Sequence, residues 1–250
     1  MVHPLGTPTY TVLGLMTALF VVAFGPTVVG QEPANQVPCS DPRGCPDLVV
    51  DPDTMAPAKH TKNFKEQSCN VQEGMIPAGE RTVMYFTFTT PNFGSGDLIV
   101  GAPGDHPEWF EWGECHGHWH FKDYADYRVW TTQGYAEWDA LRNANPDMMA
   151  SEVLAANPQL LDDFAFGGKR GFCIIDVVLY EAAAPKYLLC DFQGISVGWA
   201  DEYYDGLDGQ FVDVTGLAPG QYVLESEVNA EWLYKEESYA NNRASVLINI

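Results

Sequence analysis

Three histidines at alternate positions form the most distinctive chemical pattern in the sequence. His116, His118 and His120 lie within the segment WFEWGECHGHWHF, residues 109–121. On a β-strand, side chains at i, i+2 and i+4 point to one face, so this spacing brings three imidazoles together. Imidazole is a good ligand for copper, zinc, nickel and iron, and three ligands leave coordination positions open for water or substrate. The pattern favours a metal site, with a stacked structural histidine cluster as the alternative.

Carboxylates flank the histidine run on both sides. Glu111, Glu114, Asp123 and Asp126 are candidates to accept hydrogen bonds from the second ring nitrogens of metal-binding histidines. A solvated acidic surface is the simpler interpretation for any one of these carboxylates. The other histidines, at positions 3, 60 and 106, form no spaced cluster.

The elements that position these histidines are expected to be short strands separated by turns. Runs of β-branched and aromatic residues predict strands at 82–89, 98–100, 172–180, 210–214, 222–228 and 244–250. Residues 135–164 differ, because they carry helix formers interrupted by Asn145-Pro146 and predict two short helices inserted between strands. The expected fold class is therefore mainly β, a single β-sandwich-like domain with long loops and a short helical insertion at about 135–164.

The N-terminal residues predict export from the cytoplasm. Residues 1–30 contain no Asp, Glu, Lys or Arg, and residues 11–24 are almost wholly apolar. That length is typical of a signal peptide rather than of a bilayer span, and small residues favour cleavage before Gln31. An uncleaved anchor is the alternative. We expect a secreted or extracytoplasmic protein with no stable membrane insertion after cleavage, a loop at 31–46 and a main domain at 47–250.

Six cysteines follow the predicted signal peptide. An even number in an exported chain favours disulfides, although six cysteines allow 15 connectivities. Cys39 and Cys45 enclose a short loop that contains Pro and Gly, which favours a local bridge between them.

The balance of charges excludes whole classes of partner. The 250 residues include 13 Lys and Arg against 34 Asp and Glu, a formal charge of −21. No basic surface is therefore expected for nucleic acid or for anionic membranes. The 46% hydrophobic content excludes a disordered acidic chain. The charge is consistent with simple solubility, which we favour, or with attraction of cationic substrates.

Four segments in a fixed order resemble the lysyl oxidase family. They are ECHGHWHF at 114–121, GGKRGFC at 167–173, GISVGWADEYYDG at 194–206, and a C-terminal hairpin with DVTGLAPGQYVLESEVN at 213–229 and ESYANN at 237–242. In that family the first segment supplies the copper ligands, the second a lysine and the third a tyrosine that becomes a quinone. The resemblance extends over roughly residues 47–242.

The resemblance implies a site and an activity. The three alternating histidines would be copper ligands, and Lys169 would cross-link to Tyr203 as lysyl tyrosylquinone. Tyr204 is adjacent, so a shift by one residue is the alternative. The implied activity is oxidation of primary amines, including the lysines of protein substrates, by dioxygen to aldehydes, with release of ammonia and hydrogen peroxide. Asp201 and Glu202 are near Tyr203, and the choice of catalytic base stays open.

The resemblance also implies a disulfide between Cys115 and Cys190, which leaves Cys69 and Cys173 to pair by subtraction. Vertebrate members close the loop around the quinone tyrosine with a further disulfide. Here the corresponding positions are Trp199 and Gly209, and another expected cysteine is Met75. These losses predict a less constrained loop and resemble a microbial form of the family.

Two other functions compete with amine oxidation. A non-catalytic, exported copper-binding β-sandwich or adhesion module would use Trp109, Trp112 and Trp119 as a recognition surface. A zinc hydrolase would keep the three histidines and use Glu111 or Glu114 as its base.

Overall fold

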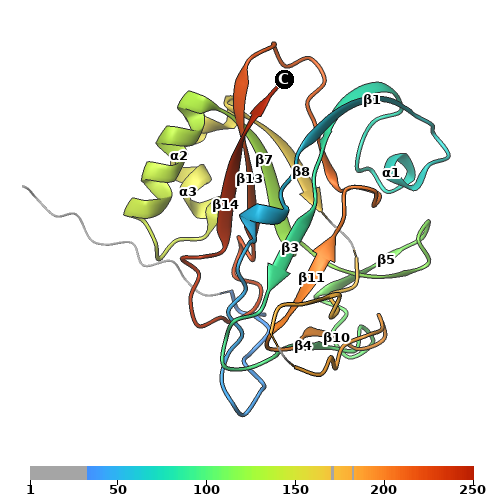
Figure 1. The fold of residues 1–250 in the computed structure, drawn as a ribbon, viewed down its shortest axis with the longest axis vertical. Coiled ribbons are helices and arrows are strands. Elements are labelled where there is room, and N and C mark those ends of the chain that lie inside the picture. The colour runs from blue at the N-terminus through green and yellow to red at the C-terminus, as the bar shows by residue number, and fades with distance from the viewer. Residues whose placement is uncertain (1–32, 170–171, 182) are drawn as a thin grey trace, which may run out of the picture.

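The computed structural model describes residues 33–169, 172–181 and 183–250 (Figure 1). The predicted signal peptide lies outside these ranges. Within the described residues, no helix combines the length and apolar character needed to cross a membrane.

A four-stranded antiparallel sheet forms one side of the molecule. Its strands run in the order β14 (Arg243–Asn249), β13 (Gln221–Val228), β7 (Ala125–Thr131) and β8 (Phe164–Lys169). The predicted helical insertion is confirmed, because α2 (Thr132–Ala144) and α3 (Ala150–Ala156) connect β7 to β8 and cover one face of this sheet (Figure 1). Thr131 begins α2 by accepting a hydrogen bond from the Gly134 amide at 2.9 Å. The indoles of Trp130 and Trp138 stack between the sheet and the helices.

The main hydrophobic core lies on the other face of the four-stranded sheet. There the sheet packs against a three-stranded sheet with the order β3 (Phe88–Pro91), β11 (Trp199–Tyr203) and β9 (Val178–Leu179). The Phe88 and Tyr127 rings join the two sheets, with centroids 5.1 Å apart. The predicted mainly β class is therefore confirmed.

Smaller sheets surround this core. They comprise β1 (Ala58–Phe64), β2 (Gly79–Tyr85) and β12 (Phe211–Asp213) in one sheet, β4 (Leu98–Gly101) with β10 (Gln193–Ile195), and β5 (Phe110–Gly113) with β6 (His118–Phe121). Two short 3₁₀ turns, η1 (Pro52–Thr54) and η2 (Pro158–Asp162), and the four-residue helix α1 (Cys69–Gln72) complete the described elements.

Two strand predictions need correction. The single strand expected at 82–89 is two strands, β2 and β3, which belong to different sheets. The strand expected at 172–180 is confirmed only at β9. Before β9 the backbone changes partners, because the Asp176 amide donates to the Tyr187 carbonyl and the Val177 amide to the Ala200 carbonyl. A run of strand-forming residues therefore crosses between neighbours without forming one ladder.

Three disulfides fix the loops. The local bridge between Cys39 and Cys45 is confirmed. The pairings implied by resemblance are wrong, because Cys69 is bonded to Cys115 and Cys173 to Cys190. The Cα atoms of these pairs are 5.4 and 5.1 Å apart, within the short range that a disulfide spans. The Cys69–Cys115 bridge anchors the turn between β5 and β6 to α1.

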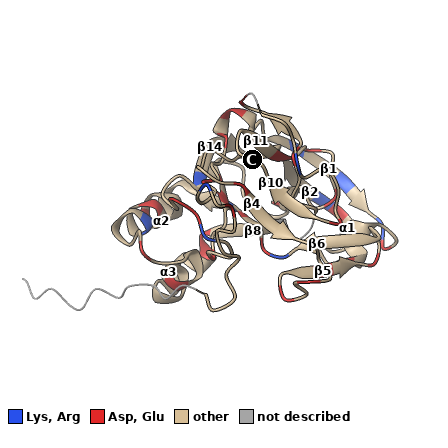
Figure 2. Ribbon diagram, turned by 90° about the horizontal axis from the view of Figure 1, so that it is seen from below, with Lys and Arg blue, Asp and Glu red and all other residues tan. Residues whose placement is uncertain are grey.

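Acidic residues are spread over the molecule rather than gathered on one element. Figure 2 shows Asp and Glu on α2, α3 and many connecting segments, while β1 carries basic residues.

Candidate metal and redox site

The β5–β6 hairpin brings the three histidines together. His118 and His120 lie on β6, whereas His116 lies in the preceding turn. The ring centroids are 4.8 Å apart for His118 and His120, and 5.4–5.7 Å from His116 to the other two. The expected convergence is confirmed, but the reason given for His116 was wrong. Its ring reaches the others from a turn in which Gly117 takes a φ of +69°, a conformation that glycine adopts without strain.

The hairpin leaves room for these rings on its inner side. Gly113 pairs with His118, and a Cβ at Gly113 would lie only 2.5 Å from His120 Cε1. The Nε2 atoms of all three histidines are shielded from solvent. Three shielded imidazole nitrogens in one place fit the ligand preferences of copper and zinc.

Glu73 is a functional candidate that the sequence did not reveal. Its Oε2 lies 2.7 Å from His116 Nδ1, and its Oε1 accepts hydrogen bonds from the Cys115 and His116 amides. Burial alone would raise the pKa of Glu73, but the hydrogen bonds from His116 and Cys115 lower it below its ordinary value. A carboxylate on Nδ1 orients an imidazole so that Nε2 can bind a metal.

The carboxylates that the sequence suggested for this role are placed differently from one another. Glu111 lies opposite His120 in the hairpin register and is exposed, Glu114 is exposed in the turn, Asp123 lines a different pocket, and Asp126 pairs with Arg128. Glu73 is 43 residues from His116 in the sequence. The signal that would have found it is the Cys69–Cys115 disulfide, which holds the segment after α1 against the histidine turn.

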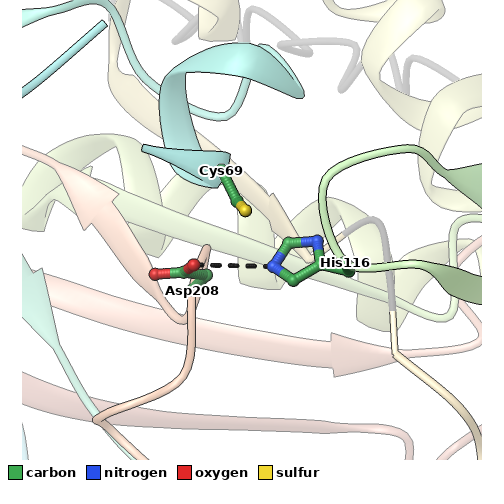
Figure 3. A group of neighbouring side chains, drawn as sticks. All are labelled: Cys69, His116 and Asp208. Carbon is green, nitrogen blue, oxygen red and sulfur yellow. Dashed lines mark ion pairs between the residues drawn. The ribbon is translucent and has the colours of Figure 1, made fainter. Parts of the chain in front are cut away.

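Asp208 approaches the same histidine from the opposite side. Figure 3 shows its carboxylate facing His116, with Oδ2 3.5 Å from Nε2, and Cys69 nearby. Two donors on one tetrahedral metal, each about 2.1 Å from it, are about 3.4 Å apart. Asp208 is thus placed to share a metal with His116, whereas Cys69 is held in its disulfide and offers no thiolate. Glu73, His116 and His120 form a second group with ligand atoms close enough for one ion.

Tyr203 lies next to the histidine cluster at the end of β11. Its side chain is 3% exposed, whereas that of Tyr204 is 54% exposed. The Tyr203 ring lies 5.7 Å from Phe172, whose ring in turn lies 5.8–6.1 Å from all three histidine rings. Phe172 therefore lies beside both the tyrosine and the metal candidates, whereas Tyr204 is exposed to solvent.

The surroundings of Tyr203 keep its hydroxyl protonated. Burial raises the pKa of Tyr203 well above its ordinary value, and the nearby Asp201 carboxylate raises it further. The phenol is thus neutral at physiological pH in the protein as described.

Strand β8 ends at Lys169, at the end of the four-stranded sheet that lies near Tyr203. Lys169 pairs with Ala125 of β7, and the preceding residue, Tyr124, has its ring 5.9 Å from that of Tyr203. Of Lys169, the structure describes the backbone alone.

A pocket of about 210 Å³ is lined by both Tyr203 and His118. His118, Tyr203, Asp201 and Glu202 contribute to its lining. Most of the remaining wall is apolar, and includes Phe172 and the Cys173–Cys190 disulfide. The pocket gives a small molecule access to both Tyr203 and His118.

Comparisons with known proteins identify the family of the chain. A family model described as lysyl oxidase matches residues 148–249. Human lysyl oxidase homolog 3 is 30% identical over 183 residues, which is 71% of this chain and 20% of that protein. The chain belongs to the lysyl oxidase family. Human lysyl oxidase homolog 1 is 26% identical over 82% of the chain, and human protein-lysine 6-oxidase is 26% identical over 80% of it. The chain covers 33% and 44% of these two relatives.

This lysyl oxidase family member holds the loop after Tyr203 by hydrogen bonds. Asn70 donates to Asp208 Oδ1 at 2.6 Å and accepts from the Gly209 amide at 2.7 Å. The space that a side chain at Gly209 would need is taken by Met75 Sδ. Met75 therefore packs against Gly209, and Asn70 ties the loop to α1.

Proposed function

We propose that this protein is a secreted copper- and quinone-dependent amine oxidase. The reaction would convert a primary amine, dioxygen and water into an aldehyde, ammonia and hydrogen peroxide. The observation that carries the proposal is the buried Tyr203 ring, which borders the same pocket as His118 and lies beside Phe172, whose ring is also close to all three converging histidines. The three disulfides support an oxidising compartment.

His116, His118 and His120 would hold copper, with Glu73 orienting His116. Bound copper supplies the redox chemistry with dioxygen that matures Tyr203 and Lys169 into lysyl tyrosylquinone, the group that takes two electrons from the amine. Lys169 contributes its amine in the neutral form, because only that form is a nucleophile. The apolar walls of the pocket leave only 3% of the Tyr203 side chain exposed.

The substrate would be a primary amine carried on a flexible chain. The pocket of about 210 Å³ is narrow and mostly apolar, which suits the aliphatic part of a lysine side chain or a small alkylamine. One relative is named protein-lysine 6-oxidase, which favours lysine-containing proteins as substrates here as well. The acidic surface disfavours nucleic acid as a partner.

Mass spectrometry of the copper-loaded protein tests the quinone directly. We expect a tryptic peptide in which Lys169 is joined to Tyr203, and a positive redox-cycling stain that Lys169→Ala abolishes. Staining that persists in Lys169→Ala would contradict the assignment, as would a stain-positive wild type that lacks the cross-linked peptide.

The exposed tryptophans of the hairpin favour a second candidate. Trp112 and Trp119 form an edge-to-face pair on β5 and β6 and are 45% and 36% exposed. Such a pair suits a recognition surface, as in a non-catalytic copper-binding adhesion module. Hydrogen peroxide released from lysine or a simple diamine under air would exclude this candidate.

A further inference from the structure

Asp201 is a buried carboxylate that faces the same pocket as Tyr203. The two residues are at i and i+2 on β11, so their side chains lie on one side of the strand. Their exposed fractions are 1% and 3%, and both line the pocket. The intervening Glu202 also contributes to the pocket lining, but it is less buried and its carboxylate accepts a hydrogen bond from Thr89.

The charge of Asp201 acts on the phenols around it. It contributes to raising the pKa values of Tyr203, Tyr124 and Tyr127. A carboxylate buried among aromatic rings is costly to keep, because ionised groups lose hydration there. Such a group within a pocket of an enzyme is more often retained for chemistry than for stability.

We propose that Asp201 binds the cationic amine of the substrate and then removes its α-proton. This inference rests on the proposed amine oxidase function and names the base that the sequence left open. Asp201 would be a catalytic residue, since its carboxylate contacts the reacting nitrogen and carbon.

The pocket walls match the two parts of such a substrate. Ile175, Val177 and Leu207 offer apolar contact for methylene groups, while Asp201 offers the opposite charge to an ammonium. A partly desolvated carboxylate is also a stronger base than one in water, because the apolar environment favours its protonated form.

The protons and electrons of the amine go to different acceptors during the proposed oxidation. The ammonium first loses a proton to water. In the oxidation step the α C–H bond breaks, its proton passes to a carboxylate oxygen of Asp201, and its electron pair passes to the cofactor. The nitrogen releases a second proton, and water adds to the carbon to give the aldehyde and ammonia. Dioxygen takes the two electrons, together with the proton from Asp201 and the proton from the nitrogen, as hydrogen peroxide.

Amine binding to the metal-free protein tests the first role without any quinone. We expect calorimetry with n-butylamine at neutral pH to show binding that Asp201→Asn weakens at least tenfold, because the ion pair is lost. Asp53→Asn is the matched control, since it removes the same charge from an exposed position on η1. Equal affinity in Asp201→Asn and the wild type would overturn the proposal.

The second role is tested in copper-loaded protein by single-turnover reduction. Quinone is first titrated with phenylhydrazine, and rates are expressed per quinone. We expect Asp201→Asn to slow anaerobic reduction by about 10²–10⁴-fold, with partial recovery in Asp201→Glu. The slowed step should show an α-deuterium isotope effect and lose the acidic limb of the wild-type pH profile.

Different results would contradict the amine oxidase function and the role of Asp201. A wild type without titratable quinone would remove the proposed function itself, whatever Asp201 does. Mature quinone with an unchanged reduction rate in Asp201→Asn would overturn the role of Asp201 alone. If Asp201→Asn fails to mature, the rate and pH profile of Asp201→Glu decide, and an unchanged profile there counts against the proposal.

Discussion

Two clusters of buried polar side chains contain different kinds of group. One is an arginine network between β7, β13, β14 and α2, and the other is the histidine–tyrosine site around the pocket beside Tyr203. The arginine network centres on Arg128, which lies 3.0 Å from Glu227 and 3.4 Å from Glu225 and also pairs with Asp126. Arg142 and Arg243 pair with the same two glutamates. Each charge faces an opposite charge, so the network is complete within the chain.

The histidine–tyrosine site gathers groups of another kind. Imidazoles, a phenol and carboxylates converge from β6, β11 and the loops beside them, and a pocket opens onto them. These groups ligate metals or exchange protons, whereas the arginine network joins permanent charges across β7, β13 and α2. The comparison teaches that burial alone does not mark a functional cluster. The types of group and the presence of a pocket do.

The largest expected effect separates Tyr203 from its neighbour. Tyr203→Phe should abolish quinone formation and amine oxidation, because the buried ring beside Phe172 would lose the oxygen that becomes a quinone. Tyr204→Phe should retain both properties, since Tyr204 is exposed. Redox staining and peroxide release measure the difference, and circular dichroism checks that both variants fold. Activity in Tyr203→Phe would end the assignment of this site.

Breaking the arginine network should cost stability rather than metal binding. Removing one partner of a buried ion pair costs about 3–5 kcal/mol, because the remaining charges stay buried without compensation. We therefore expect Arg128→Ala to lower the free energy of unfolding by that amount in urea titrations, with copper affinity of the folded fraction unchanged. Arg81→Ala breaks a partly exposed pair with Asp213 and should cost at most about 1 kcal/mol. Similar losses in both variants would contradict the comparison.

Glu73→Gln should weaken metal binding, with little effect on the free energy of unfolding. Loss of a carboxylate partner from a metal-binding histidine typically lowers metal affinity about 10–100-fold. Competition with a copper chelator measures the change. Glu114→Gln is the matched control, because Glu114 is exposed beside the same histidines. If Glu114→Gln weakened copper binding as much as Glu73→Gln, the role of Glu73 in orienting His116 would be wrong.

Local patterns in the sequence predicted the general fold and the histidine convergence. Runs of β-branched and aromatic residues identified β13 and β14, and the run of helix formers identified α2 and α3. The same signal failed at residues 172–177, because it reports a preference for extended backbone and not which strand the backbone pairs with. Strand partners are set by tertiary contacts that lie far apart in the chain.

Contacts between distant segments also explain what the sequence missed at the site. Glu73 reaches His116 across 43 residues, and the disulfides that arrange this region were assigned to the wrong partners. The i, i+2 spacing of Asp201 and Tyr203 was visible, but the pocket beside them requires side chains from several segments. Whether Lys169 and Tyr203 become linked stays a prediction.

An effect that shows only in the pH dependence of stability is expected for Glu236, which lies between β13 and β14. Burial raises its pKa to about 8, although Asn229, Asn242 and the Leu48 amide donate hydrogen bonds to its carboxyl group. The folded protein therefore keeps a proton that the unfolded chain releases above its ordinary pKa of 4.5. The free energy of unfolding should fall as pH rises from about 5 to 8, with this group contributing up to about 1.4 kcal/mol per pH unit.

Urea unfolding at several pH values across that range isolates this contribution. Glu236→Gln should make the decline shallower than in the wild type, because it has no proton to release. Glu237→Gln should leave the slope unchanged, since Glu237 is solvent-accessible and its pKa is lowered rather than raised. Equal slopes in the wild type and Glu236→Gln would show that Glu236 is not neutralised by a proton. The chain would then stabilise a buried carboxylate here through amides alone, unlike the guanidinium pairing of the arginine network.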